Sequence, residues 1–438
     1  MKKKVAVIGL WHQGIVGAAC LADWGYDVLG ADTSNVTIEN LNQAKAPLFE
    51  PGLDDLLFKS ISSGNLKFTT NAAEAVQNRS FVILMHDTPV DENDCSDLSV
   101  VFKAIEEITP TLTDGVTIHI TAQVPVGTCD EIIMRIKNVR ASLKFTLAYS
   151  PENLRLGQAI ERFRKPPLPI IGSDDATAFQ RLEELYGPCG VAWQTCNLRT
   201  AEMSKHALNS FLAMSITFAN ELGNLCDEVG ADGHRLAELL RMEPRIGSKS
   251  MLFPGLGFSG GTLARDMQTL RGLGDKFDID TPQLDGAWKS NRQQNNLVVR
   301  QLKKHLGITL KGKKICLLGL TYKPDTSTLR RSAAMGVIAD LVNEGAEIST
   351  SDPRADRNEL NSYKGFSFFN EPLDAAKNAD ALVLMTPWPD YKILDFISLK
   401  SAMSGSLIFD TANLWKVEEV ISAGFKYLDI GSGRRERL

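Results

Sequence analysis

The chain has 438 residues, of which 43% are hydrophobic and 23% are charged, and its formal net charge is −5 at pH 7. This length is too great for one ordinary hydrophobic core and predicts two or three domains. The weakly acidic balance argues against nucleic-acid or membrane-surface binding, because the basic clusters, residues 2–4 and 434–437, lie only at the chain ends.

The cysteines and the apolar runs indicate a protein of a reducing compartment. The seven cysteines are scattered without a Cys-x-x-Cys pair, and most lie in or beside apolar runs, as small core residues do. This spacing predicts no metal site. No stretch reaches the ~18 apolar residues of a membrane span. We therefore expect a cytoplasmic protein with no membrane, nucleic-acid or metal partner.

The first third of the chain alternates short apolar runs with helical patterns. Residues 17–25 and 100–112 have helical periodicity. Five apolar runs are typical of buried strands: residues 4–10, 26–32, 80–87, 116–123 and 145–150. Such alternation predicts a doubly wound parallel sheet, the Rossmann-like α/β class.

The turn after the first run looks like a dinucleotide-binding turn with one change. A strand ending at Gly9 is followed by a helix containing Gly14, and the next strand ends at Asp32. A carboxylate at that place accepts hydrogen bonds from the adenosine ribose and repels a 2′-phosphate, which favours NAD over NADP. The usual middle glycine, which lets the backbone approach the pyrophosphate, is Trp11 here.

Two interpretations of Trp11 remain open. In the first, which we favour, the turn is rebuilt: Trp11 points outward and His12 or Gln13 contacts the phosphates. In the second, Trp11 fills the pyrophosphate path and NAD does not bind. The expected cofactor-binding residues are Gly9, Trp11, His12, Gln13, Gly14, Asp32, Thr88 and Pro89.

The middle of the chain changes character. Residues 200–230 lack glycine and proline until Gly223 and keep an apolar stripe at helical spacing, which predicts one long helix. Its broad apolar face predicts either a homodimer core or an internal core helix.

Near residue 313 the strand-and-helix pattern of the first third returns, with predicted strands at 313–322, 346–353, 379–388 and 405–413. The predicted organisation is therefore a cofactor domain at 1–197, a central helical dimerisation and linker region at 198–307, and a second α/β domain at 308–438.

Several motifs together resemble one family, the UDP-glucose/GDP-mannose dehydrogenases. The matching segments cover nearly the whole chain in the family's order: "PLFEPGLDDLL" (47–57), "VPVGT" (124–128), "SPENLRLG" (150–157), "AEMSKHALNSF" (201–211), "EPRIG" (243–247), "FPGLGFSGG" (253–261) and "GLTYKPDTSTLRRS" (319–332). The resemblance implies that the domain at 308–438 binds a nucleotide-sugar (UDP-sugar) substrate and that NAD is the cofactor. It also implies two successive oxidations of a sugar C6 alcohol to a carboxylate.

The resemblance assigns the hydride-transfer chemistry to three residues that this chain retains. Lys205, Asn209 and Asp266 match the lysine, asparagine and aspartate that stabilise the alkoxide. An ammonium and an amide beside a developing oxyanion suit hydride removal. The alternative for Lys205 and Asn209 is a pair of solvated helix residues one turn apart.

The catalytic cysteine of the family is absent from its expected place. The segment "GFSGGTLARD" puts Thr262 at that position and Arg265 at the place of a family lysine. A threonine hydroxyl does not form an acyl intermediate unless a base adjoins it. Cys129, just after the "VPVGT" segment, is the nearest replacement candidate. We therefore expect Lys205, Asn209, Asp266, Glu152 and Thr262 to make up the catalytic set.

Other family positions have changed as well. Gln123 replaces a threonine, Leu156 replaces the second glutamate of the "SPENLRLG" stretch, and Asp87 replaces a glycine near the cofactor. Ala412 stands where the family has a nucleotide-contacting arginine. The resemblance gives the following substrate-binding residues, Arg245 reaching in from a neighbouring subunit: Glu152, Asn153, Leu154, Lys205, Asn209, Arg245, Phe253, Gly257, Gly260, Lys323 and Arg330.

Three functional hypotheses follow. The favoured one is an NAD-dependent dehydrogenase of a UDP-sugar type substrate that performs a single two-electron oxidation. The second is a complete 6-dehydrogenase that makes a uronic acid without covalent catalysis, with Glu152 as the base that hydrates the aldehyde. The third is a nucleotide-sugar-binding protein without redox turnover.

Overall fold

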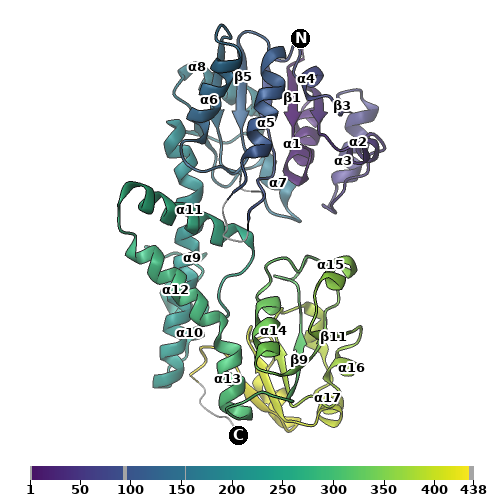
Figure 1. The fold of residues 1–438 in the computed structure, drawn as a ribbon, viewed down its shortest axis with the longest axis vertical. Coiled ribbons are helices and arrows are strands. Elements are labelled where there is room, and N and C mark those ends of the chain that lie inside the picture. The colour runs from purple at the N-terminus through teal and green to yellow at the C-terminus, as the bar shows by residue number, and fades with distance from the viewer. Residues whose placement is uncertain (1, 92–95, 153, 434–438) are drawn as a thin grey trace. The chain divides into compact units, whose positions relative to one another are not determined.

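The computed structural model describes residues 2–91, 96–152 and 154–433 (Figure 1). The chain divides into two compact units, residues 1–208 and residues 209–438. Each unit contains one α/β sheet, and the helix α9 (Leu198–Val229) contributes its first residues to one unit and the remainder to the other. The three predicted domain boundaries remain a prediction.

The first unit is built on a sheet with the strand order β3-β2-β1-β4-β5-β6-β7-β8. Its strands are β1 (Lys4–Ile8), β2 (Asp27–Ala31), β3 (Leu66–Thr69), β4 (Phe81–Leu84), β5 (Val116–Ile120), β6 (Phe145–Tyr149), β7 (Ile170–Gly172) and β8 (Gln194–Cys196). The pairings are parallel except between β6 and β7, which meet antiparallel at Tyr149 and Gly172. The first six strands have the Rossmann order, which confirms the predicted fold class.

Helices cover both faces of this sheet, because successive strand residues point to opposite sides. Val5 and Val7 face a core shared with α1, α3, α7 and α8, whereas Ala6 and Ile8 face a core shared with α4, α5 and α6. The helices are α1 (His12–Asp23), α2 (Asn35–Asn42), α3 (Leu53–Ser62), α4 (Ala72–Ala75), α5 (Ser99–Ile108), α6 (Thr128–Val139), α7 (Ala159–Arg164) and α8 (Ala176–Leu185), with short 3₁₀ turns at Thr109–Thr111 and Gly187–Cys189.

The second unit repeats the same topology. Its sheet has the order β11-β10-β9-β12-β13-β14, with parallel pairing throughout. The strands are β9 (Lys314–Leu318), β10 (Glu347–Ser351), β11 (Phe366–Phe369), β12 (Ala381–Leu384), β13 (Leu407–Asp410) and β14 (Lys426–Leu428).

Some helices of the second unit precede its first strand in the chain, and the others alternate with its strands. The helices are α10 (Gly233–Arg241), α11 (Gly261–Phe277), α12 (Pro282–Asn295), α13 (Leu297–Leu306), α14 (Ala333–Asn343), α15 (Arg357–Ser362), α16 (Pro372–Ala376), α17 (Phe396–Ala402) and α18 (Val417–Ser422), with a 3₁₀ turn at Pro389–Ile393. Part of α9 packs with α11 and α12 in a small separate core around Ala213, Met267 and Ala287.

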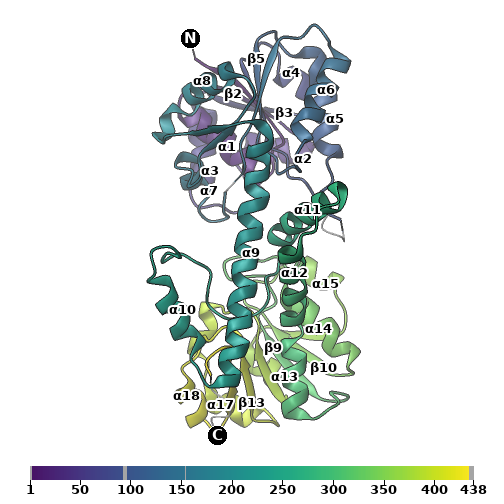
Figure 2. The same ribbon diagram turned by 90° about the vertical axis from the view of Figure 1, so that its left-hand side faces the viewer.

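The predicted long helix is confirmed. Figure 2 shows α9 as one continuous helix over 32 residues, within two residues of the predicted bounds. Among the residues that the structure describes, no helix is long and apolar enough to cross a bilayer.

Candidate functional site

Two glycines shape the turn between β1 and α1. Gly9 has φ +93°, and a Cβ there would lie 2.8 Å from the Cγ of His86, the second residue after β4. A Cβ on Gly14 would overlap the carbonyl oxygen of Gly9, so α1 packs this closely on β1 only with glycine at position 14. The chain keeps these two glycines because the turn requires them, whereas position 11 carries no such requirement.

The two sheets differ at the acid that ends their second strand. Asp32 accepts bonds from the Leu10 N–H (2.8 Å) and the Ser34 N–H (3.0 Å) and remains partly exposed. A carboxylate has lone pairs for about four bonds, so Asp32 can still accept from ribose hydroxyls. The equivalent Asp352 is 3% exposed and also accepts from the Trp388 indole at 3.1 Å. The Asp352 carboxylate is thus buried against an indole, whereas the Asp32 carboxylate remains accessible to a ligand.

Trp11 points outward, and the two side chains after it are already engaged. Trp11 is the residue before α1 and is 48% exposed. His12 Nε2 lies 3.0 Å from Glu50 Oε2, and the Gln13 amide donates to Thr121 Oγ1 at 2.7 Å. The indole is half exposed, and the choice between the two interpretations of the turn stays a prediction. For the side chain of His12 or Gln13 to contact a phosphate, its hydrogen bond to Glu50 or to Thr121 would have to break.

A cavity of about 220 Å³ opens at this end of α1, and we call it the α1 pocket. It is lined by Trp11, His12, Gln13, Leu48, Met85, Asp87, Glu152, Leu154 and Leu156. In open parallel sheets, ligands bind where the strand order reverses, here between β1 and β4. The Leu154 N–H donates to Glu152 Oε1 and orients that carboxylate. Asn153, predicted to bind substrate, lies outside the described residues.

The predicted Thr88 and Pro89 follow β4. Thr88 is 2% exposed and its hydroxyl donates to the Gln123 carbonyl at 2.7 Å, which ties the loop after β4 to the loop after β5. Pro89 is exposed.

The start of α9 is held against the loop after β5 by two buried side chains. Glu202 accepts from the N–H groups of Gly127 (2.6 Å) and Cys129 (2.8 Å) at the N-terminus of α6, and His206 bonds the Val124 carbonyl (2.9 Å). Burial raises the pKa of Glu202, although its backbone bonds oppose this. Lys205, between these two anchors, is 6% exposed. It is therefore not a solvated helix lysine.

In the second unit, Asn209 and Asp266 form a buried pair. The Asn209 amide donates to Asp266 Oδ2, and the two residues are 6% and 0% exposed. This geometry excludes the alternative of a solvated Asn209. Thr262 is exposed in the first turn of α11, one turn before Asp266.

The segment that ends at Thr262 is placed by amide side chains and by the loop after β9. A Cβ on Gly257 would approach Asn291 Oδ1 to 2.6 Å, and Asn291 Nδ2 donates to the Phe258 carbonyl at 3.1 Å. The Gly260 N–H donates to the Arg331 carbonyl at 2.9 Å. The glycine-rich segment and the "TYKPDTSTLRR" segment, about seventy residues apart in the sequence, are thus neighbours within this unit.

The remaining predicted substrate residues are more exposed. Lys323 places its ammonium 5.3 Å from the Tyr322 ring centroid, and Arg330 is exposed. The Phe253 ring stacks on His234 with centroids 6.0 Å apart. The Arg245 side chain is 88% exposed and pairs with Glu243 at 2.8 Å.

Comparisons with known proteins agree with this geometry. Residues 3–190, 199–293 and 316–417 match the NAD binding domain, the central domain and the UDP binding domain of the UDP-glucose/GDP-mannose dehydrogenase family. The chain belongs to this family. It is accordingly an NAD-dependent nucleotide-sugar dehydrogenase that acts on a CH–OH group.

Individual relatives cover almost the whole chain. It is 36% identical to a UDP-glucose 6-dehydrogenase of Rhizobium meliloti over 98% of this chain and 99% of the relative. Among solved structures, a UDP-glucose dehydrogenase from Pyrobaculum islandicum matches with a TM-score of 0.87 and 27% identity, over 98% of this chain and 97% of the other. A UDP-D-ManNAc dehydrogenase from Pyrococcus horikoshii matches with a TM-score of 0.86 and 27% identity, covering 98% and 99%.

Three of this dehydrogenase's departures from the family pattern meet in the α1 pocket. Trp11, Asp87 and Leu156 all line it, although they come from three separate loops. By the resemblance, the family is expected to carry two glycines and one glutamate at these positions. The three side chains therefore lie around one pocket.

The dehydrogenase has no activated thiol among its described residues. Burial raises the pKa of each of the six described cysteines, to about 12 for Cys20 and Cys316 and to about 11 for Cys189. Cys129 is fully buried, and the adjacent Glu202 raises its pKa further. A thiol in that environment does not serve as a nucleophile. Cys95 lies outside the described residues.

Two buried residues that hold segments around the α1 pocket were not identified from the sequence. Glu50 lies in the quoted "PLFEPGLDDLL" segment but had no assigned role, and its partner His12 is 38 residues away. His119 is buried in β5 and bonds Tyr186 and Ser150. A polar residue inside an apolar run is the signal that could have pointed to His119.

Proposed function

We propose that this chain catalyses a single two-electron oxidation of an alcohol on a UDP-sugar and stops at the carbonyl product. The proposal is carried by the difference between two residues of α11, Asp266 and Thr262. The buried Asp266 keeps its Asn209 partner, whereas one turn earlier the exposed Thr262 stands where the family has its nucleophilic cysteine. The groups for hydride removal are thus retained without the group for acyl transfer.

Lys205, Asn209 and Asp266 would stabilise the alkoxide from which the hydride leaves. The Lys205 ammonium is buried, so its field on an oxyanion is less screened than in water. Asp266 accepts a hydrogen bond from one N–H of the Asn209 amide. This bond fixes the plane of the amide and therefore the direction of its second N–H. Such preorganised donors are worth about 10² to 10³ in rate.

The same geometry offers no second step through a covalent intermediate. Thr262 has no ionisable thiol, and its hydroxyl needs an adjoining base to become a nucleophile. The other acid-base candidate on its turn, Arg265, carries a guanidinium that does not deprotonate in proteins. Thr262 would bond a sugar hydroxyl.

NAD fits the turn of the first unit, where it supplies the hydride acceptor when bound. Gly9 and Gly14 let β1, the turn and α1 pack closely together, and Asp32 would accept from the ribose hydroxyls. The N–H groups of the first turn of α1, directed at the pocket, would bind the phosphates. Gly9, Trp11, His12, Gln13, Gly14, Asp32, Thr88 and Pro89 remain the proposed cofactor set.

UDP-glucose is the substrate that we propose, since several relatives are named as UDP-glucose 6-dehydrogenases. Lys323 and Arg330 would bind the diphosphate. Ala412 lacks the charge of the family arginine, so the nucleotide end loses a charge-assisted bond of roughly 1.5 to 3 kcal/mol.

A complete 6-dehydrogenase is the second candidate. It is favoured by Glu152, which lines the α1 pocket and is held by the Leu154 N–H. A carboxylate so placed could activate a water to hydrate an aldehyde, after which a second hydride transfer would give the uronic acid without a thioester.

We also propose a homodimer formed along α9. Phe211, Phe218 and Leu225 are 68%, 52% and 60% exposed and are spaced by seven residues, so they form one exposed apolar seam. The highly exposed Arg245 would extend to the substrate of the second subunit. The thiols of the described cysteines suit the reducing cytoplasm, which is the location that we propose.

The test compares Lys205→Ala with Thr262→Ala in a UDP-glucose oxidation assay. We expect Lys205→Ala to lose about 10² to 10³ in kcat and Thr262→Ala to keep most of its turnover. Arg199→Ala, which removes an exposed cation from the same helix α9, is the control and should behave as the natural protein. A Thr262→Ala protein as inactive as Lys205→Ala, or a covalent sugar adduct on the natural protein in mass spectrometry, would overturn the proposal.

A further inference from the structure

Glu50 is a buried carboxylate that accepts three hydrogen bonds. Its side chain is 1% exposed. Glu50 Oε2 accepts from the Gly157 N–H at 2.8 Å and lies 3.0 Å from His12 Nε2, and Oε1 accepts from the Ala159 N–H at 2.8 Å. A buried charge is retained only when such partners compensate its desolvation. Removing it therefore leaves three donors without their acceptor.

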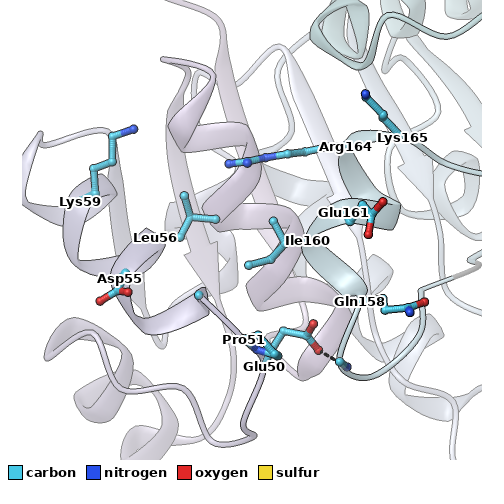
Figure 3. Close-up of a pocket in the computed structure, with 12 residues that line it drawn as sticks. Glu50, Pro51, Asp55, Leu56, Lys59, Gln158, Ile160, Glu161, Arg164 and Lys165 are labelled. Atoms are coloured by element: carbon cyan, nitrogen blue, oxygen red, sulfur yellow. Dashed lines mark hydrogen bonds between the residues drawn. The ribbon is translucent and has the colours of Figure 1, made fainter.

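These bonds join three segments that are distant in the sequence. Glu50 lies in the loop before α3, His12 is the first residue of α1, Ala159 begins α7 and Gly157 lies just before it. Figure 3 shows the Glu50 carboxylate with its bond toward the segment that precedes α7, and Glu50 lines a groove between this segment and α3. The groove itself, about 620 Å³, carries mixed charges and points to no particular ligand.

The joined segments form two walls of the α1 pocket. Trp11 and His12 belong to one wall, and Leu154 and Leu156 belong to the other. The second wall also orients Glu152 through the Leu154 N–H. At the other end of this wall, Ser150 is fixed by His119 at 2.8 Å. Besides the direct packing of α1 on α7, Glu50 is thus a polar contact between the cofactor turn and residues 157–159.

We propose that Glu50 is a positioning residue that couples NAD binding at the β1–α1 turn to the arrangement of residues 154–158, and through Leu154 to Glu152. The backbone of His12 would be fixed when NAD is bound at the turn, while the His12 side chain keeps its bond to the Glu50 carboxylate. That carboxylate in turn holds Gly157 and Ala159. The inference rests on the proposed placement of NAD at this turn. It needs no particular sugar and no particular number of oxidation steps.

The test is hydrogen exchange by mass spectrometry on peptides that cover residues 10–20 and 154–164, with and without NAD. In the natural protein NAD should slow exchange in both peptides. In Glu50→Gln, NAD should still slow exchange in residues 10–20, but its effect on residues 154–164 should fall about fivefold or more. Glu161→Gln, which removes an exposed carboxylate from α7 itself, is the matched control and should behave as the natural protein.

A second pair of variants keeps the test informative if Glu50→Gln does not fold. His12→Phe keeps a ring but removes the donor to Glu50, so it should uncouple the two peptides. His12→Gln restores an N–H donor and should recover part of the coupling, which a purely structural loss would not.

Equal protection of residues 154–164 by NAD in all variants overturns the coupling while leaving the cofactor site in place. Binding of NAD without protection of residues 10–20 in the natural protein overturns the placement of the cofactor, and the coupling with it.

Discussion

His119 should make the free energy of unfolding of the first unit fall at acidic pH, and replacing His119 should remove most of this dependence. The imidazole is fully buried in β5, between the Tyr186 hydroxyl (3.0 Å) and Ser150 Oγ (2.8 Å). Burial lowers its pKa from 6.5 to about 3. We expect His119→Gln, which can keep one of these bonds, to unfold with a much weaker pH dependence than the natural protein.

The magnitude follows from the difference in proton binding. In the unfolded chain the imidazole takes up a proton below pH ~6.5, whereas the folded protein does so only near pH 3. The stability that depends on the neutral imidazole is therefore present above pH 6.5 and is lost as the pH falls. Between pH 7 and pH 5 the loss is about 2 kcal/mol, since each pH unit below 6.5 contributes about 1.4 kcal/mol.

The assay is urea unfolding at pH 7, 6 and 5, followed by pulsed hydrogen exchange on peptides from β5 and β6. Peptide resolution is needed because the two units need not unfold together. At pH 7 His119→Gln should be less stable by about 1 to 3 kcal/mol for the bond it loses. By pH 5 most of that gap should close. Ser150→Ala, which keeps the imidazole, should retain the pH dependence. A constant gap between the natural protein and His119→Gln would refute the reasoning.

Three further changes test the cofactor turn and the dimer. Asp32→Ala should weaken NAD binding by roughly 1 to 3 kcal/mol in calorimetry and leave NADP binding no weaker, and equal losses for both cofactors would contradict the role of Asp32. Gly14→Ala should reduce NAD affinity by more than about tenfold, because the added Cβ overlaps the Gly9 carbonyl and α1 must move; Gly187→Ala, where the structure has open space, should not. Phe218→Glu should convert the dimer to monomers in sedimentation, because it places a charge on the exposed seam of α9; an unchanged sedimentation coefficient would place the interface elsewhere.

Local sequence signals were sufficient for much of the fold. Apolar runs predict the strands that are buried on both faces, and the stripe over 200–230 predicts α9 to within two residues. They were insufficient for β7 and β8, which have three residues each, and for the antiparallel pairing of β7 with β6. Three residues are too few to show a periodic pattern, so the pairing of these strands is decided by contacts that are distant in the sequence.

The candidate site shows the same division between local and distant determinants. Gly9, Gly14 and Asp32 could be identified because a tight turn needs particular residue types at a fixed spacing. The partners of His12 and Gln13, namely Glu50 and Thr121, could not be found in this way, because they are 38 and 108 residues away. The gathering of Trp11, Asp87 and Leu156 around one pocket likewise depends on how three loops pack.

The central claim is that the sugar alcohol is oxidised once. The direct measurement counts the NADH formed per UDP-glucose consumed, at completion and with excess NAD, and identifies the product by mass spectrometry. One NADH per UDP-glucose, with a product lighter than the substrate by two hydrogens, is the result that we predict. Two NADH per UDP-glucose and a carboxylate product would contradict the claim and establish the Glu152-assisted 6-dehydrogenase in its place.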